Sequence, residues 1–233
     1  MSLPVILLAG GLGTRLQSVV KDVPKPMAPV AGKPFLSWVL DDLCRQGIQE
    51  VILSVGYRQE VIRETYGEQY KTLHIRYSSE DKPLGTGGAI RKAFALAGKE
   101  AFVLNGDTFF QVDLSGLYAF YRRMEADVAI ALKRLQQFDR YGTVTINEQS
   151  VITTFNEKKP CAEGLINGGV YVVSEKVFAY SLLPEVFSFE QHILQAAVGL
   201  GRFAGLEQEG YFIDIGIPDD YAKAQDDFSR VGH

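Results

Sequence analysis

The chain begins with an apolar segment that runs directly into a glycine-rich turn, and this junction constrains the fold more than any other feature. Residues 4–9 are short and apolar, as in a buried strand of a parallel sheet, and Gly10-Gly11-Leu12-Gly13 follows at once. Open α/β sheets bind ligands at the carboxyl ends of their strands. Glycines let backbone N–H groups approach phosphate oxygens, and the N-terminus of a following helix adds partial positive charge. The junction therefore predicts a phosphate-binding turn.

Two commoner glycine motifs do not fit this turn. The dinucleotide fingerprint G-x-G-x-x-G would need a third glycine where Leu16 stands. A P-loop ends in Gly-Lys followed by Ser or Thr, whereas Gly32-Lys33 is followed by Pro34. For the glycines alone, an ordinary strand-to-helix turn with a solvated Arg15 stays an open alternative.

Two cations follow the glycines and strengthen the phosphate-binding interpretation. Arg15 lies directly after the turn, and Lys25 stands between Pro24 and Pro26. We expect them to add full positive charges to the partial charges of the backbone amides, in a cradle for a nucleoside triphosphate. The residues of this segment expected to contact the nucleotide are Leu8, Ala9, Gly10, Gly11, Gly13 and Thr14.

Strand and helix patterns alternate through the first half of the chain. The segments expected as strands are residues 4–9, 50–55, 73–77 and 101–104. The segments with apolar residues at helical spacing are residues 36–43, 86–97 and 117–124. This alternation predicts an α/β fold with a Rossmann-like, mainly parallel mixed sheet and helices on both faces.

After residue 127 the expected strands follow one another without clear helices between them, which is typical of hairpins or a mixed sheet. These strands are residues 128–132, 143–146, 151–155 and 170–173. Helices around 189–198 and 219–228 flank a last strand at 212–215. Since no linker or repeat interrupts the chain, we expect a single domain over residues 1–233. About residues 1–126 form its nucleotide-binding half, and about residues 127–233 its sugar-phosphate-binding half.

Composition excludes several classes of function. Of 233 residues, 46% are hydrophobic and 22% are charged, as in ordinary globular proteins, and the formal net charge is −4. No basic stripe that would neutralise nucleic-acid phosphates is visible. No apolar run approaches the roughly 20 residues that span a bilayer, and the N-terminus does not resemble a signal peptide. We therefore expect a cytoplasmic protein with no nucleic-acid or membrane partner.

Two aspartates are the candidate metal ligands. Asp107 ends the string Asn105-Gly106-Asp107 after an apolar strand, and Asp214 stands in a similar position near the end of the last strand. Two carboxylates beside a phosphate-binding turn suit Mg²⁺, which takes one or two carboxylates together with substrate phosphates. Each aspartate alone could equally cap a turn. The two cysteines and three scattered histidines suggest neither a zinc site nor a histidine-activated nucleophile.

The motifs taken together resemble the sugar-1-phosphate nucleotidyltransferase family. The matching strings, in order, are Gly10-Gly11-Leu12-Gly13-Thr14-Arg15-Leu16, Pro24-Lys25-Pro26, Pro83-Leu84-Gly85-Thr86-Gly87-Gly88-Ala89, Asn105-Gly106-Asp107 and Asp214-Ile215-Gly216-Ile217-Pro218. The resemblance implies the glycosyltransferase-A-like form of the α/β fold. It also implies an enzyme that joins a sugar 1-phosphate to a nucleotide and releases pyrophosphate. Because the attacking phosphate is already an anion, no general base is required.

The resemblance also implies roles for individual residues. Arg15, Lys25 and Asp107 would be catalytic, with Arg15 on the triphosphate, Lys25 at the reacting phosphates, and Asp107 and Asp214 holding Mg²⁺. The pair Glu157-Lys158 is similar to the family's acidic–lysine pair, with the carboxylate on sugar hydroxyls and the lysine on the sugar phosphate. The residues that match the family's sugar-pocket loops are Gly142, Asn167 and Gly168. Without the family, Glu157-Lys158 would more simply be a solvated charge run.

The base pocket, by family position, includes Glu80, Gly85 and Thr86. A carboxylate can accept hydrogen bonds from both N1–H and the 2-amino group of guanine, which favours GTP. Four longer strings resemble the members of the family that act on D-glycero-α-D-manno-heptose 1-phosphate. They are residues 21–29, 105–110, 139–144 and 164–169.

Several alternatives stay open from sequence. Mannose 1-phosphate is the main rival acceptor, and a uridylyl or thymidylyl donor is the rival to GTP. Near the last motif Phe212 and Ile213 stand where relatives commonly carry a tryptophan region, which weakens the metal role of Asp214. A sugar-nucleotide sensor would be signalled by loss of a charged member of the set, and none is lost. A homo-oligomer is left open.

Overall fold

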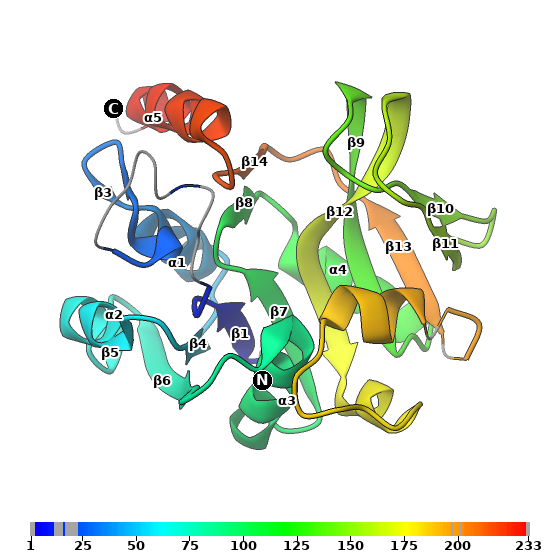
Figure 1. Cartoon of the computed structure of the whole chain (residues 1–233), viewed down its shortest axis with the longest axis horizontal. Coiled ribbons are helices and arrows are strands. Elements are labelled where there is room, and N and C mark those ends of the chain that lie inside the picture. Colours follow the sequence, from blue (N-terminus) through cyan, green and yellow to red (C-terminus); the bar gives the residue numbers. More distant parts are fainter. Residues whose placement is uncertain (1–2, 12–15, 17–22, 197, 201, 232–233) are drawn as a thin grey trace.

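The computed structural model describes residues 3–11, 16, 23–196, 198–200 and 202–231. An eight-stranded sheet runs through the middle of the molecule in the order β13-β9-β12-β7-β1-β4-β6-β5 (Figure 1). Its strands are β1 (Val5–Leu8), β4 (Glu50–Val55), β5 (Gln69–Tyr70), β6 (Leu73–Ser79), β7 (Glu100–Asn105), β9 (Val128–Phe138), β12 (Cys161–Ser174) and β13 (Phe203–Glu207).

Parallel pairing dominates the part of this sheet formed by β7, β1, β4 and β6. Strands β7, β1, β4 and β6 are parallel neighbours, and β13 pairs in parallel with β9. Strand β12 is antiparallel to both β7 and β9, so it joins the two parallel groups. The predicted fold class, a mainly parallel mixed sheet with helices on both faces, is confirmed.

Alternation of buried side chains along the central strands creates two cores. Val5 and Leu7 of β1 belong to one core, and Ile6 belongs to the other. Helices α1 (Phe35–Arg45), α2 (Gln59–Tyr66), α4 (Leu114–Arg123) and α5 (Pro218–Val231) contribute to the first core. Helix α3 (Gly85–Ala97), the 3-10 helix η2 (Glu175–Ala179) and the π-helix η3 (Glu190–Gln195) contribute to the second. Both faces are therefore covered, which explains why β1 is apolar throughout and why β4 and β7 are apolar over most of their length.

Three small two-stranded sheets complete the fold. They are β2 (Pro29–Val30) with β3 (Lys33–Pro34), β8 (Thr108–Phe110) with β14 (Phe212–Asp214), and β10 (Val144–Ile146) with β11 (Ile152–Phe155). The β8–β14 pair brings a late segment of the chain to the end of β7, because Asp214 lies opposite Thr108. This pairing positions one of the predicted metal ligands.

The chain reverses its direction of travel across the sheet at β1. From β1 it passes to β4 and β6 on one side and then returns to β7 on the other. The connections through α1 and α2 cover one face, whereas α3 covers the opposite face. Such a switch point opens a crevice at the carboxyl ends of the strands. Gly10 and Gly11 after β1 and Asp107 after β7 lie at this edge.

Several elements differ from the sequence prediction. The short segments 128–132 and 170–173 are parts of the long strands β9 and β12. Helix α2 and strand β13 were not predicted. Helix α2 buries only Ile62 and Tyr66, and β13 contains Gly205, so neither carries a strong periodic signal. Among the described residues, no helix is both long and apolar enough to span a membrane.

Phe228 anchors α5 to the part of the fold that carries the site. Its ring centroid lies 4.7 Å from that of Trp38, 5.1 Å from that of Phe109 and 5.9 Å from that of Tyr211. We predict that Phe228→Ala lowers the free energy of unfolding by about 3–5 kcal/mol, because it leaves a cavity among packed rings. Urea denaturation measures this change. Leu182→Ala, at a fully exposed position, is the control and should stay within about 0.5 kcal/mol of wild type.

Candidate active site

Lys25 and two aspartates from distant parts of the chain meet at the carboxyl end of the sheet. Lys25 is the first residue of the 3-10 helix η1 (Lys25–Met27). Pro26, the second residue, restricts the backbone φ angle there. Asp107 follows β7, and Asp214 ends β14. The amide of Ile215 donates to the carbonyl of Asp107 at 3.0 Å, which holds these two segments side by side. The three charged side chains form what we call the charge cluster.

The geometry of the charge cluster is that of a cation shared by two carboxylates. Lys25 Nζ lies 2.5 Å from Asp107 Oδ2 and 3.7 Å from Asp214 Oδ1. The lysine side chain is 12% exposed, against 38% for Asp107 and 28% for Asp214. Burial, and then the neighbouring Asp107, raise the pKa of Asp214, whereas Lys25 acts in the opposite direction. The cluster thus holds two carboxylates close together at a partly buried position.

Gly106 is required where β7 approaches β1. Its amide donates to the carbonyl of Leu8 at 2.9 Å, and a Cβ at this position would collide with that same carbonyl oxygen. The close approach brings Asp107 next to the segment that follows β1. A glycine within Asn-Gly-Asp is therefore a steric requirement of the site.

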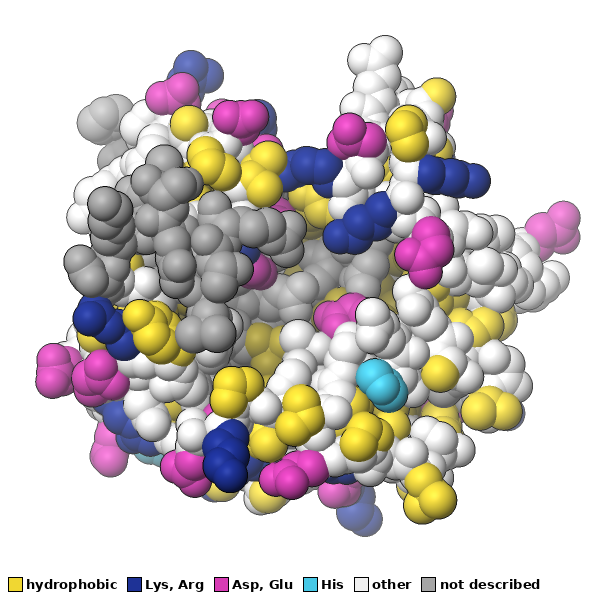
Figure 2. Space-filling view, viewed as in Figure 1, with side chains coloured by type: hydrophobic (Ala, Val, Ile, Leu, Met, Phe, Trp, Pro, Cys, Tyr) yellow, Lys and Arg dark blue, Asp and Glu magenta, His cyan; other side chains and the backbone are white. Residues whose placement is uncertain are grey.

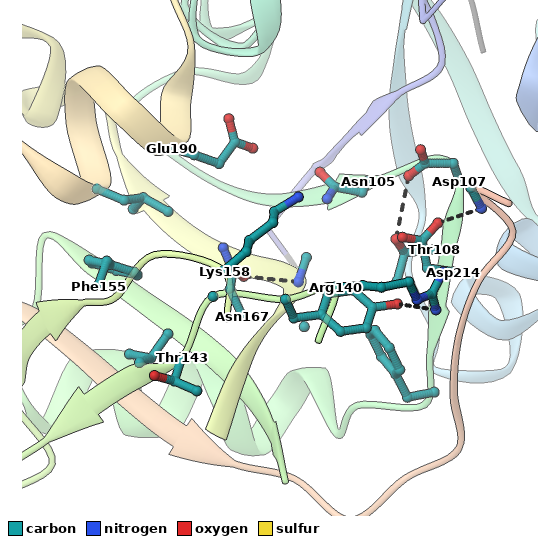
Figure 3. A pocket seen from close by; sticks show the side chains of 18 of the residues that line it. Asn105, Asp107, Thr108, Arg140, Thr143, Phe155, Lys158, Asn167, Glu190 and Asp214 are labelled. Atoms are coloured by element: carbon teal, nitrogen blue, oxygen red, sulfur yellow. Dashed lines mark hydrogen bonds between the residues drawn. The ribbon is translucent and has the colours of Figure 1, made fainter. Parts of the chain in front are cut away.

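A cavity of about 520 Å³, the acceptor cavity, opens beside the charge cluster (Figure 3). The described residues that line it are Lys25, Asn105, Asp107, Thr108, Arg140, Tyr141, Gly142, Thr143, Val144, Phe155, Asn156, Lys158, Asn167, Gly168, Gly169, Tyr171, Glu190, Leu194, Gln195, Phe212, Asp214, Gly216 and Ile217. Polar groups predominate on one side, and Figure 3 shows Lys158, Asn105 and Glu190 directed toward the same open space. The cavity can therefore bind a ligand that is both anionic and rich in hydroxyl groups.

Hydrogen bonds hold the polar wall of the acceptor cavity in place. Asn167 Nδ2 donates to the hydroxyl of Tyr171 at 2.8 Å, and the amide of Gly169 donates to Asn167 Oδ1 at 3.0 Å. Burial raises the pKa of Tyr171, so its hydroxyl stays neutral. Gly142 is packed so closely against the carbonyl of Asn156 that a Cβ would not fit.

Aromatic rings also line the acceptor cavity. Phe212 contacts Phe110 and Tyr141 edge to face, at centroid distances of 5.5 and 6.0 Å. Arg140 lies over the ring of Tyr141 and forms an ion pair with Asp220 of α5. The segment in which relatives were expected to carry tryptophan therefore supplies an aromatic ring to the cavity in this chain as well.

A second cavity of about 450 Å³, the nucleotide cavity, lies at the glycine turn. The described residues that line it are Leu8, Gly10, Gly11, Ser54, Gly56, Tyr57, Glu80, Asp81, Lys82, Pro83, Gly85, Thr86 and Ala89. Glu80 Oε2 accepts the amide of Leu84 at 2.8 Å, so the carboxylate is held at the start of α3. Its other oxygen, Oε1, accepts a long bond of 3.5 Å from Ser54 and no other hydrogen bond from the described residues, so it can still receive donors from a ligand.

The two cavities adjoin at two places. Leu8, from the nucleotide cavity, is the direct β-sheet partner of Asn105, from the acceptor cavity. Thr86 lines the nucleotide cavity and donates at 2.7 Å to Glu190, which lines the acceptor cavity. Figure 2 shows a hollow on this face of the molecule where acidic and basic side chains gather. One ligand in each cavity could therefore meet near the charge cluster.

The structure brings most of the predicted site residues together. The nucleotide cavity includes Leu8, Gly10, Gly11, Glu80, Gly85 and Thr86, and the acceptor cavity includes Lys25, Asp107, Gly142, Lys158, Asn167, Gly168 and Asp214. Arg15, Gly13 and Thr14 lie outside the described residues.

Two of the predicted site residues do not line either cavity. Ala9 is fully buried, and its amide donates to the carbonyl of Ser54. Glu157 is exposed, although its neighbour Lys158 reaches the acceptor cavity. The expectation of a loop at Asn167-Gly168 is wrong, because both residues belong to β12. The β9–β12 register is irregular between Asn167 and Tyr171, and Asn167 and Gly168 in this part of β12 line the acceptor cavity.

Sequence reasoning missed some of the lining residues. Asn105 could have been found, since it belongs to the same string as Asp107. Glu190 carried no signal, because it lies in a helical pattern far along the chain. Its place in the wall of the acceptor cavity depends on the contact between α3 and η3.

Mg²⁺ fits the donor set of the charge cluster. No group of three or more potential metal-binding His, Cys, Asp or Glu side chains occurs among the described residues, so a complete protein cage is absent there. Two neighbouring carboxylates are nevertheless the number that Mg²⁺ uses when substrate phosphates supply further oxygens. Asp107 and Asp214 would be the residues that hold the ion.

Comparison with known proteins agrees with this geometry. A family model described as nucleotidyl transferase matches residues 4–230. The chain belongs to the nucleotidyl transferase family. It is 48% identical over 216 residues to D-glycero-alpha-D-manno-heptose 1-phosphate guanylyltransferase of Campylobacter jejuni, covering 93% of this chain and 96% of the relative. It is 49% identical over 221 residues to the protein of the same name from Aneurinibacillus thermoaerophilus, covering 94% and 96%.

Solved structures extend the likeness to the fold. HddC from Yersinia pseudotuberculosis complexed with GMP-PN is 36% identical, with a TM-score of 0.86 over 97% of this chain and 100% of that chain. Members of the nucleotidyl transferase family are enzymes, so the predicted family and the predicted enzyme class are both confirmed.

The charge cluster gives a prediction about stability and pH. Burial raises the pKa of Asp214, and the positive charge of Lys25 lowers it. In Lys25→Met that positive charge is lost, so the native-state pKa of Asp214 should rise further above its unfolded value of about 4. A carboxyl group with a raised native pKa contributes stability below the unfolded pKa and loses it as the pH rises through the native pKa. Lys25→Met should therefore be destabilised more at about pH 7 than at about pH 4.

Chemical denaturation of the wild type and the variant at several pH values measures this difference. Lys159→Met is the control, because Lys159 is exposed and has no ion pair among the residues that the structure describes. A destabilisation of Lys25→Met that is the same at both pH values would contradict the electrostatic account of the cluster.

Proposed function

We propose that the chain transfers the guanylyl group of GTP to D-glycero-α-D-manno-heptose 1-phosphate, giving the GDP-heptose and pyrophosphate. The observation that carries this proposal is the 48–49% identity to two heptose 1-phosphate guanylyltransferases over almost the whole of both chains. The pair of adjoining cavities beside the charge cluster supports it, because the reaction needs two anionic substrates to meet end to end.

GTP would occupy the nucleotide cavity. Glu80 has one oxygen with room for further donors, as recognition of guanine N1–H and the 2-amino group requires. The backbone at Gly10 and Gly11 would lie along the phosphates. HddC, which was crystallised with the guanine nucleotide GMP-PN, supports a guanine nucleotide in this chain as well.

The sugar 1-phosphate would occupy the acceptor cavity, with its phosphate toward Lys158 and Lys25. Lys158 is directed into the open space of this cavity, as Figure 3 shows. Asn167 and the backbone at Gly142 would contact the sugar. We propose a single domain whose first half, about residues 1–126, binds the nucleotide and whose second half, about residues 127–233, binds the sugar phosphate.

The chemistry then requires orientation and charge stabilisation. A phosphate oxygen of the sugar 1-phosphate attacks the α-phosphorus of GTP in line with the bond to the leaving pyrophosphate. The nucleophile is an anion already, so no side chain has to remove a proton. Lys25 would neutralise charge at the reacting phosphates, and Arg15 would act on the triphosphate. Mg²⁺ bound to Asp107 and Asp214 would supply further charge neutralisation.

The acceptor and donor can be tested directly. We predict that GTP with D-glycero-α-D-manno-heptose 1-phosphate gives the highest kcat/KM in a pyrophosphate-release assay over several nucleotides and sugar 1-phosphates. Mannose 1-phosphate lacks one hydroxyl-bearing carbon, so a pocket that hydrogen-bonds this group can reject it by about 10- to 10⁴-fold.

Mannose 1-phosphate is the second candidate acceptor because a mannose-1-phosphate guanylyltransferase is among the relatives of this chain. The chain is 34% identical to mannose-1-phosphate guanylyltransferase of Mycobacterium tuberculosis, although it spans only 64% of that relative. Equal or better kcat/KM with mannose 1-phosphate would replace the heptose assignment. A preference for UTP, dTTP or CTP would remove the role given to Glu80.

The cytoplasmic location of the protein and its assembly as a homo-oligomer stay predictions.

The metal requirement is a separate prediction. EDTA should abolish turnover, and added Mg²⁺ should restore it. Asp107→Asn and Asp214→Asn should each raise the Mg²⁺ concentration for half-maximal activity by at least about 10-fold, or eliminate turnover, because each variant loses a charged oxygen ligand. Asp219→Asn, at an exposed carboxylate of α5, is the matched control. An unchanged Mg²⁺ titration in both cavity variants would remove these aspartates from the metal site.

A further inference from the structure

Glu190 is the acidic side chain of the acceptor cavity that the reaction described above does not use. The other two carboxylates of the lining, Asp107 and Asp214, both lie within 4 Å of Lys25. Glu190 has no ion pair among the residues that the structure describes. It begins the π-helix η3, a rare helix type that often occurs at functional sites. A carboxylate in a ligand cavity without a cation needs another partner.

One oxygen of Glu190 is held firmly, and the other is not. Thr86 donates to Oε2 at 2.7 Å, and Ser188 donates to the same oxygen at 2.9 Å. Thr86 is itself fixed, because its hydroxyl oxygen accepts the amide of Phe189 at 2.9 Å. In the described part of the chain no hydrogen bond reaches Glu190 Oε1. The side chain is therefore oriented in advance, with one oxygen available to a ligand.

The chemistry of that ligand follows from the charge of the group. An ionised carboxylate only accepts hydrogen bonds, so it repels phosphate and attracts hydroxyl or amine donors. Lys158 is directed into the same open space in Figure 3, and under the proposed function it binds the sugar phosphate. A molecule that carries phosphate at one end and hydroxyl groups at the other satisfies both residues at once.

We propose that Glu190 binds a hydroxyl group of the acceptor sugar through Oε1 and so helps to select hydroxyl-rich sugar phosphates. This inference rests on the proposed function. The bond from Thr86 also links the residue to the nucleotide cavity, since Thr86 lines that cavity. Glu190 thus belongs to the wall that the two substrates share.

Glu190→Gln tests the inference, because the amide oxygen of Gln can still accept from Thr86 and Ser188. A charge-assisted bond to a sugar hydroxyl would become a weaker neutral one. We expect the dissociation constant for heptose 1-phosphate, measured by calorimetry on enzyme loaded with a nonhydrolysable GTP analogue, to rise about 10-fold. The affinity for the GTP analogue should stay unchanged. Glu185→Gln, at an exposed carboxylate on the same segment, is the matched control.

Acceptor analogues that each lack one hydroxyl group show whether the contact is direct. One analogue should lack the hydroxyl group that Glu190 binds. Removing that hydroxyl group should reduce the affinity of the wild type more than the affinity of Glu190→Gln, because the contact is already weakened in the variant. Equal losses in both proteins for every analogue would overturn the inference, as would an unchanged affinity for heptose 1-phosphate or a parallel loss of affinity for the GTP analogue. If the wild type binds GTP but no heptose 1-phosphate, the proposed function fails instead.

Discussion

The contact of Lys25 with Asp107 and Asp214 is the interaction on which the rest of the site depends. Two carboxylates held close together and partly buried repel each other, and the shared ammonium group offsets that repulsion. The β8–β14 pairing brings the two acids together, and Pro26 directs the turn that carries the lysine. The proposed phosphate and Mg²⁺ sites use the same place, where the fold holds a cation and two carboxylates together.

The two cavities owe their adjacency to the change of direction at β1. Strands β4 and β7 flank β1, so the glycine turn and Asp107 lie at the same edge of the sheet although nearly 100 residues separate them. The antiparallel strand β12 then adds the polar residues of the acceptor cavity beside β7. A nucleotidyl transfer needs this arrangement, since most of its barrier lies in bringing two polyanions into line.

Much of the nucleotide side could be predicted from the sequence. Strand β4 has the predicted bounds, and α3 begins within one residue of the predicted start, because apolar runs and helical spacing are local signals. The acceptor side was harder to predict. A helix around residues 189–198 was predicted, and η3 (Glu190–Gln195) lies there. The irregular β9–β12 register near Asn167 and the contact of η3 with α3 involve segments that are distant in sequence, so no local pattern encodes them.

The sequence by itself determined the family, the α/β class and the identity of the charged residues, because glycine spacing, strand length and motif order are properties of short segments. Only the tertiary structure decided which residues share a cavity. Lys158 lines the acceptor cavity, whereas its neighbour Glu157 does not. Ala9 does not line the nucleotide cavity, and Glu190 lines the acceptor cavity although the sequence did not indicate it. The physical reason is that cavity walls form where segments distant in sequence pack together, and the direction of each side chain depends on contacts that the chain makes only after folding.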